Sequence, residues 1–319
     1  MQLTSSNPST NMKTKMINKV AALGLGAISF ISAQATAQLK VVATTPDLAS
    51  VAREIGGDRV NVVALAKPTE DPHFVDAKPS FIVTLNRADA LVEGGAELEL
   101  GWLPPLLENS RNSKVAAGAP GRIVASEGIR LLEIPTSFDR SKGDIHSLGN
   151  PHFMIDPGAV KVVARNIASH FAQLDPKIAA TYNANLARFN SRIDSKLADW
   201  QKQLAPYRGA KIVTYHRDFI YFAQRFGLSI VDELEPKPGI SPSPAHLAQV
   251  IGEMKRNNVK VILVQPFQNR KTAETVARQT GATVIDAPQQ PGAARNTSSY
   301  FDNMDNLVHA IADELGEKK

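Results

Sequence analysis

The sequence contains seven histidines and no cysteine, so any metal site that it builds must use imidazole and carboxylate donors rather than thiolates. Three histidines lie within segments that have a helical pattern and are interpreted as partly exposed helix positions: His170, His246 and His309. The other four lie in loops or at the ends of predicted strands: His73, His146, His152 and His216. This second group supplies the candidate ligands, and an ordinary loop histidine is the competing interpretation for each of them taken alone.

Two candidate donors follow predicted strands in the C-terminal half of the chain. His216 closely follows an apolar segment at 211–214, and Asp286 directly follows a short strand at 283–285. Open α/β sheets bind their ligands beyond the carboxyl ends of their strands. Both residues are therefore placed where a binding site is expected, although a turn or helix-cap carboxylate is the alternative role for Asp286.

Two further candidates come from the N-terminal half. His73 follows a strand near 60–65 through a proline-rich turn, and His152 ends the loop before a helix at 157–173. With two candidates from each half, all four could converge on one cleft. Three imidazoles and one carboxylate suit tetrahedral Zn(II), with Zn–N distances of about 2.0–2.1 Å. Mn(II) prefers more oxygen ligands and a higher coordination number.

The sequence lacks the motifs that are typical of several other functional classes. The chain has no HExxH motif, no GxSxG motif and no glycine-rich phosphate-binding loop, and no catalytic acid–base pair is evident. The formal net charge is +5, but three of the basic residues lie in the expected leader, and without them the net charge is about +2. Because nucleic-acid binding needs a concentrated basic surface, no nucleic-acid partner is predicted.

Residues 1–37 have the pattern of a cleaved signal peptide. A basic segment with Lys13, Lys15 and Lys19 precedes a short apolar segment at 20–31, and small residues then lead to Ala37. We expect cleavage after Ala37, with Ala35 as the alternative position, and a periplasmic mature protein. No cysteine follows the apolar segment, so a lipid anchor is not expected.

Strand and helix patterns alternate along the rest of the chain, which predicts the α/β class. We expect two lobes, 38–173 and 207–319, each a small and mostly parallel sheet flanked by helices. A long rigid helix within 174–206 is predicted to bridge them, because apolar residues recur there every three or four positions. Such a helix is roughly 40 Å long. An ordinary amphipathic core helix is the alternative.

Three motifs resemble those of the ZnuA/TroA-like family, the zinc- and manganese-binding solute-binding proteins of ABC importers. These are the segments 70–80 (EDPHFVDAKPS), 150–157 (NPHFMIDP) and 215–222 (YHRDFIYF). The chain departs from the family pattern at 75–78, at Met154 where Trp is common, at Asp218 where Ala is common, and at Gln265 where Glu is frequent. The resemblance covers most of the mature chain.

The resemblance implies that His73, His152, His216 and Asp286 bind the metal. A histidine at position 216, where manganese-binding members tend to have Glu, favours Zn(II), with Mn(II) as the alternative. The long loop 135–151 lacks a histidine-rich tract and offers Asp139, Asp144 and His146, of which His146 is a candidate auxiliary ligand. A solvated loop residue is the alternative for His146.

The resemblance also implies a monomer with no catalytic activity that delivers metal to an ABC permease at the inner membrane. A periplasmic metallochaperone is a further candidate partner. Four donors leave no open position for an activated water, unlike a catalytic zinc site. A zinc hydrolase with Asp286 as general base, and a secreted adhesin with an incidental metal, are the competing hypotheses.

Overall fold

The computed structural model describes residues 38–135, 146–237 and 239–317. The expected signal peptide, 1–37, and the loop residues Asp139 and Asp144 lie outside these ranges. None of the described helices combines the length and the apolar character needed to cross a membrane. The described residues form one compact unit, which is built around two four-stranded sheets.

The first sheet is parallel throughout, with strand order β2-β1-β3-β4. Its strands are β1 (Leu39–Ala43), β2 (Val60–Ala64), β3 (Ala90–Glu93) and β4 (Arg122–Val124). Successive residues of β1 point to opposite faces of the sheet and pack into different hydrophobic clusters. Val41 packs with α1 (Pro46–Gly56), whereas Val42 packs with α2 (Pro79–Asn86) and α3 (Leu103–Ser110). Helices therefore cover both faces, as a parallel sheet requires.

The second sheet repeats this arrangement with strand order β6-β5-β7-β8. Its strands are β5 (Lys211–Thr214), β6 (Ser229–Glu233), β7 (Val261–Val264) and β8 (Thr283–Asp286). Val213 packs with α7 (Pro244–Asn257) and α8 (Arg270–Thr280). Ile212 packs on the other side, in a cluster that includes residues of α6 (Ile220–Phe226) and α9 (Tyr300–Glu317).

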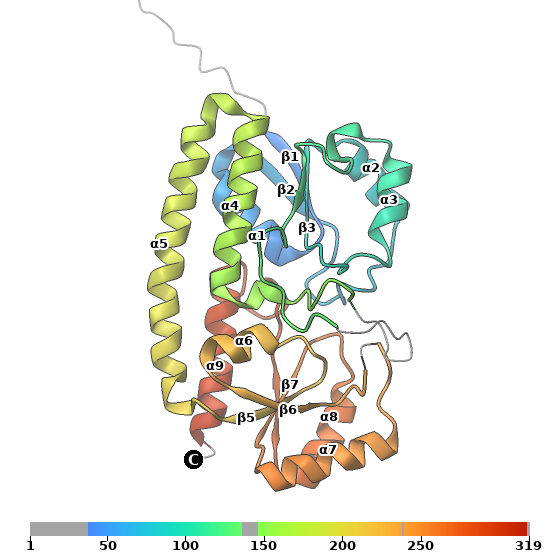
Figure 1. Cartoon of the computed structure of the whole chain (residues 1–319), viewed down its shortest axis with the longest axis vertical. Helices are drawn as coiled ribbons and strands as arrows, with labels where there is room; N and C mark the ends of the chain where they lie inside the picture. Colours follow the sequence, from blue (N-terminus) through green and yellow to red (C-terminus); the bar gives the residue numbers. More distant parts are fainter. Residues whose placement is uncertain (1–37, 136–145, 238, 318–319) are drawn as a thin grey trace, which may run out of the picture. The chain divides into compact units, whose positions relative to one another are not determined.

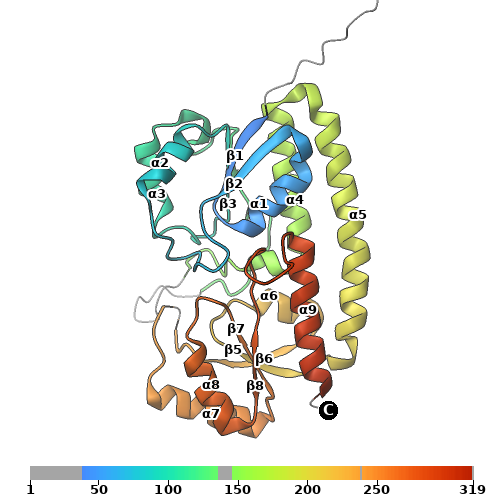
Figure 2. The same cartoon turned by 180° about the vertical axis from the view of Figure 1, so that it is seen from behind.

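The longest helix links the two sheets through the helices beside them. It is α5 (Ala179–Leu204), with 26 residues, and it contacts α1, α4 (Pro157–Leu174) and α9. Figures 1 and 2 show α4 and α5 side by side, with α9 next to the C-terminal half of α5. Within the predicted range 174–206 the α-helix begins at Ala179, and Pro176–Ile178 before it form a 3-10 turn.

One hydrophobic cluster runs from the first sheet to the second. It includes Val41 of β1, Phe189 and Trp200 of α5, and Leu263 of β7. The two-lobed α/β fold with a long bridging helix is thus confirmed, whereas the exact lobe boundaries remain a prediction. A continuous packed core also resists large movements of one lobe against the other, because such movements would open cavities.

Candidate metal centre

Three histidines from distant parts of the chain meet in one cluster. His73 lies in the turns after β2, His152 precedes the 3-10 turn Phe153–Ile155, and His216 follows β5. Each offers a ring nitrogen, and these nitrogens all lie within 4.8 Å of one another. Ring centroids are 5.0 Å apart for His73 and His152, 5.6 Å for His73 and His216, and 5.3 Å for His152 and His216. The structure thus brings together three of the four predicted donors.

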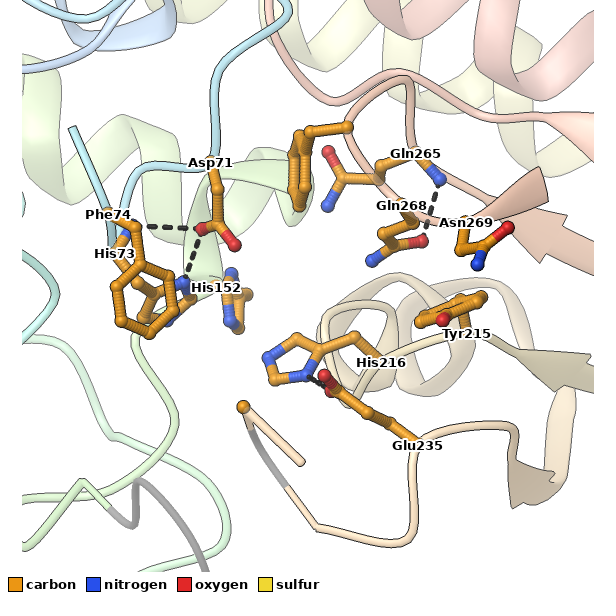
Figure 3. Close-up of a pocket in the computed structure, with 12 residues that line it drawn as sticks. Asp71, His73, Phe74, His152, Tyr215, His216, Glu235, Gln265, Gln268 and Asn269 are labelled. Carbon is orange, nitrogen blue, oxygen red and sulfur yellow. Dashed lines mark hydrogen bonds and ion pairs between the residues drawn. The ribbon is translucent and has the colours of Figure 1, made fainter. Parts of the chain in front are cut away.

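The histidines line a cavity of about 200 Å³. Figure 3 shows His73, His152 and His216 directed toward a common space, with Phe74 beside His73. Phe74 is 63% exposed and therefore lies at the mouth of the cavity. Chain segments from both halves line the space, so an ion held there would contact both halves at once.

Two carboxylates orient two of the imidazoles. Oδ1 of Asp71 lies 2.9 Å from Nδ1 of His73, and Oε2 of Glu235 lies 2.5 Å from Nδ1 of His216 (Figure 3). When Nδ1 carries the proton in this bond, Nε2 is left with a free lone pair. Carboxylate partners of this kind fix the ring orientation of metal-binding histidines.

The turn that holds His73 is itself well anchored. The backbone N–H of His73 donates to Oδ1 of Asp71 at 2.9 Å, and the indole N–H of Trp102 donates to the carbonyl of Pro72 at 2.9 Å. Burial opposes ionisation of Asp71, but the hydrogen bond and the charge of His73 lower the pKa of this carboxyl. Asp71 is therefore held as an anion against the imidazole.

His152 is the most deeply placed of the three. The residue is 8% exposed, and its Nε2 atom is buried without a hydrogen-bond partner among the described residues. Burial, followed by the charges of His73 and His216, holds the pKa of His152 well below 6.5. The ring is therefore neutral at physiological pH, which is the form that coordinates a metal. An ion in the cavity would satisfy the orphaned nitrogen.

Local hydrogen bonds explain why this ring is so well placed. The amide oxygen of Asn150 accepts the backbone N–H of His152 at 3.0 Å, and the Asn150 amide donates to the carbonyl of Arg217 at 2.7 Å. Tyr221 donates its hydroxyl proton to the carbonyl of Asn150 at 2.7 Å. The loop that carries His152 is thus tied to the segment that carries His216.

His146 lies against the edge of the cluster. Its Nε2 is 3.1 Å from Nε2 of His73, and the two rings stack with centroids 5.1 Å apart. Burial and then the charge of His73 lower the pKa of His146 to about 4, although Glu97 opposes the shift. Glu97 also accepts a hydrogen bond from the hydroxyl of Ser147 at 2.5 Å, which holds this segment in place. The described part of the loop therefore adds a fourth imidazole to the cluster, beside His73.

The fourth predicted donor lies apart from the three histidines in this structure, and its role as a ligand stays a prediction. Asp286 is the last residue of β8, its side chain is 67% exposed, and its carboxylate pairs with the guanidinium of Arg270. It does not belong to the group of donors formed by the three histidines, nor does it line their cavity. The reason is that β8 is the edge strand two positions from β5, and the first residue of α8 captures its terminal carboxylate.

Sequence reasoning missed Asp71 and Glu235 as partners of the histidines. Glu235 comes two residues after the end of β6, which is the strand that pairs with β5 on the side away from β7. The rule that sites lie beyond strand ends could therefore have identified Glu235. Asp71 stands two residues before His73 in the quoted motif, so its proximity was visible in the sequence.

Comparisons with known proteins agree with this architecture. Residues 41–314 match the family model described as ZnuA, zinc-uptake complex component A, periplasmic. The manganese ABC transporter substrate-binding lipoprotein PsaA of Streptococcus anginosus is 23% identical over 290 residues, covering 88% of this chain and 90% of that protein. The iron ABC transporter substrate-binding lipoprotein MtsA of Streptococcus pyogenes serotype M1 is 24% identical and covers 77% of this chain and 78% of that protein. A crystal structure of ZnuA superposes with a TM-score of 0.73 at 26% identity, covering 86% of this chain and 98% of that chain.

Proposed function

Because the chain belongs to the ZnuA family, we propose that it captures Zn(II) in the periplasm and delivers it to an ABC permease in the inner membrane. It is a metal-binding, substrate-binding protein of an ABC transporter and not an enzyme. Such proteins work with a membrane permease and its ATPase. One observation supports this choice of cargo above all: three imidazoles meet around one space, each with a ring nitrogen that could bind an ion.

The donor chemistry supports zinc as the cargo. His73, His152 and His216 are the proposed ligands, and imidazole nitrogen suits Zn(II) better than Mn(II), which prefers oxygen donors. The nearest carboxylates are already engaged, Asp71 with His73 and Glu235 with His216. Mn(II) is the second candidate, because relatives named for manganese exist and both carboxylates line the cavity.

Asp286 joins the proposed ligand set only if it leaves its ion pair with Arg270. His146 is proposed as an auxiliary ligand, because its Nε2 already lies 3.1 Å from that of His73. Neither residue is needed for a three-histidine site whose remaining position is completed by a water or by another oxygen donor.

We also propose the compartment in which the protein acts and the partners that it has there. The leader pattern at 1–37 supports export to the periplasm, and the near-balanced charge of the mature chain supports the absence of a nucleic-acid partner. We further propose that the protein acts as a monomer and that a periplasmic metallochaperone is a candidate donor of the ion.

A competition titration of the mature protein against a chromophoric zinc chelator tests the proposal. Wild type should bind one Zn(II) per chain and should prefer Zn(II) to Mn(II). Replacing His152 with Ala should weaken zinc binding at least about a hundredfold, because a complete donor is lost from the coordination sphere. His309 is a matched control, since it lies on α9 with its Nδ1 hydrogen-bonded to the carbonyl of Asp305. If H152A bound zinc as tightly as H309A, the ligand assignment would be refuted. If wild type bound Mn(II) more tightly than Zn(II), Mn(II) rather than Zn(II) would be the proposed cargo.

A further inference from the structure

The turn between β3 and α3 has an unusual backbone. Gly95, Ala96 and Glu97 follow one another with φ angles of +73°, +51° and +67°, all in the left-handed region. This region suits glycine, but it is unfavourable for Ala96 and Glu97, because a Cβ atom there lies too close to a backbone carbonyl. Strained residues of this kind persist only where the surrounding structure holds them, and they are concentrated at functional sites.

A buried carboxyl group holds the base of this turn. Oε1 of Glu99 accepts the backbone N–H of Gly94 at 2.7 Å and the hydroxyl of Thr44 at 2.6 Å. Oε2 of Glu99 accepts the backbone N–H of Gly95 at 3.2 Å. These bonds tie the turn to the end of β1, so the direction in which Glu97 projects from it is fixed.

Glu97 binds the segment that carries His146. Its Oε2 accepts the backbone N–H of Ser147, and its Oε1 accepts the Ser147 hydroxyl at 2.5 Å. Ser147 directly follows His146, whose Nε2 lies 3.1 Å from Nε2 of His73. The strained turn therefore holds the chain one residue away from the imidazole at the edge of the metal cluster.

Residues 146–150 depend on hydrogen bonds rather than on packing for their position. At the far end, the backbone N–H of Asn150 donates to the carbonyl of Leu132 at 2.8 Å. Leu148, between the two attachments, is 56% exposed and therefore contributes little packing. The two bonds from Ser147 to Glu97 are thus the attachment nearest to His146.

We propose that Glu97 is a positioning residue for the metal centre: through Ser147 it holds His146 against His73 and so slows the departure of a bound ion. An imidazole held beside an ion is present at high effective concentration and recaptures the ion as it leaves. The inference rests on the proposed function, because it assumes that zinc binds between the three histidines. It requires two hydrogen-bonding atoms at position 97 and does not depend on the charge of the side chain.

The test measures zinc release from the loaded mature protein to an excess of chromophoric chelator, by stopped flow, in wild type, E97A, E97Q and E108A. We expect E97A to release zinc about 3- to 10-fold faster, the range expected for the loss of one or two hydrogen bonds. E97Q should restore most of the slow release, because its amide oxygen can accept the Ser147 N–H while its NH₂ group donates to the Ser147 hydroxyl. E108A is the matched control, since Glu108 is an exposed residue of α3.

A double variant distinguishes positioning of His146 from a general structural role. If Glu97 acts through His146, E97A/H146A should release zinc no faster than H146A, because the residue that Glu97 positions is already absent. A purely structural role of Glu97 would instead add the effect of E97A to that of H146A.

The outcomes also separate this inference from the proposed function. Wild-type protein that fails to bind zinc overturns the proposed function, and the inference with it. Tight binding by wild type with unchanged release in E97A overturns only the inference, as does an E97Q protein as fast as E97A or a double variant faster than H146A. If E97A does not fold, S147A replaces it, because this variant removes the hydroxyl donor and leaves the turn intact. An S147A protein with the wild-type release rate overturns the inference.

Discussion

Oε2 of Glu235 lies 2.5 Å from Nδ1 of His216, so a carboxylate from the end of β6 holds an imidazole from the end of β5. Removing this partner by E235A should weaken zinc binding about 10- to 100-fold, because the ring loses its fixed orientation and its added basicity. E235Q, which retains an acceptor oxygen, should lose less. Competition titrations of both variants give the order, and wild-type affinity in E235A would contradict the role of Glu235.

Zinc affinity should fall as the pH decreases through the pKa of His216. Burial acts to lower this pKa, but the hydrogen bond to Glu235 and the nearby acidic charges raise it above 6.5 overall. A proton on the imidazole competes with the ion, so the loss should begin above pH 6.5. His152, with a pKa well below 6.5, and His146, with a pKa of about 4, stay neutral in that range. An affinity that stays flat between about pH 8 and pH 5 would exclude a histidine site.

The raised pKa of His216 affects the stability of the metal-free protein in the opposite direction, because here it favours acidic pH. A histidine whose pKa is raised by folding stabilises the protein below its unfolded pKa, here 6.5, and that contribution is lost as the pH rises through the folded pKa. The melting temperature of metal-free wild type should therefore exceed that of E235Q most at mildly acidic pH. A difference that grows from pH 6 toward about pH 8 would contradict this sign.

The parallel sheets and the three candidate donors that meet in the cluster could be predicted from sequence. Short β-branched segments mark buried strands, and positions after such strands mark candidate site residues, which identified His73 and His216. His152 was identified as the residue that ends the long loop before a helix, and by its motif. The fate of Asp286 could not be predicted, because it depends on the side chain of Arg270 at the start of α8. No spacing rule specifies which cation a strand-end carboxylate will contact.

Substitution of Asp286 tests this difference between sequence and structure. D286N should change zinc affinity by less than about threefold, because the carboxylate lies outside the cavity and is largely exposed. Its surface pair with Arg270 should contribute at most about 1 kcal/mol to stability. R270M serves as the control, since it frees the carboxylate without removing it. A large loss of affinity in D286N would show that Asp286 leaves Arg270 when the ion binds.

His146 should contribute to binding less than the three central histidines. H146A is expected to weaken zinc binding by less than about tenfold, whereas H73A should abolish tight binding, because His73 belongs to the central group and His146 contacts only its edge. Stopped-flow release of zinc to a chelator should be faster in H146A, since a nearby neutral imidazole is lost. Equal effects of H146A and H73A would place His146 in the central ligand set.

The long helix should determine the stability of both halves together. Trp200 of α5 is fully buried, and its indole N–H donates to Oδ1 of Asp305 on α9 at 2.7 Å. W200A should lower the free energy of unfolding by about 3–5 kcal/mol through loss of packing. W200F should lower it by less, because the phenyl ring keeps part of the packing and loses the rest of the indole together with a hydrogen bond of about 1 kcal/mol.

Urea denaturation followed by circular dichroism and by intrinsic fluorescence measures both effects. Because one hydrophobic cluster joins β1, α5 and β7, the two signals should move together in a single transition for wild type and for both variants. Two separate transitions in W200A, with one half retaining wild-type stability, would show that α5 does not couple the halves. The substitution lies in the bridging helix and not at the cavity, so the fraction of W200F that is folded should bind zinc with wild-type affinity.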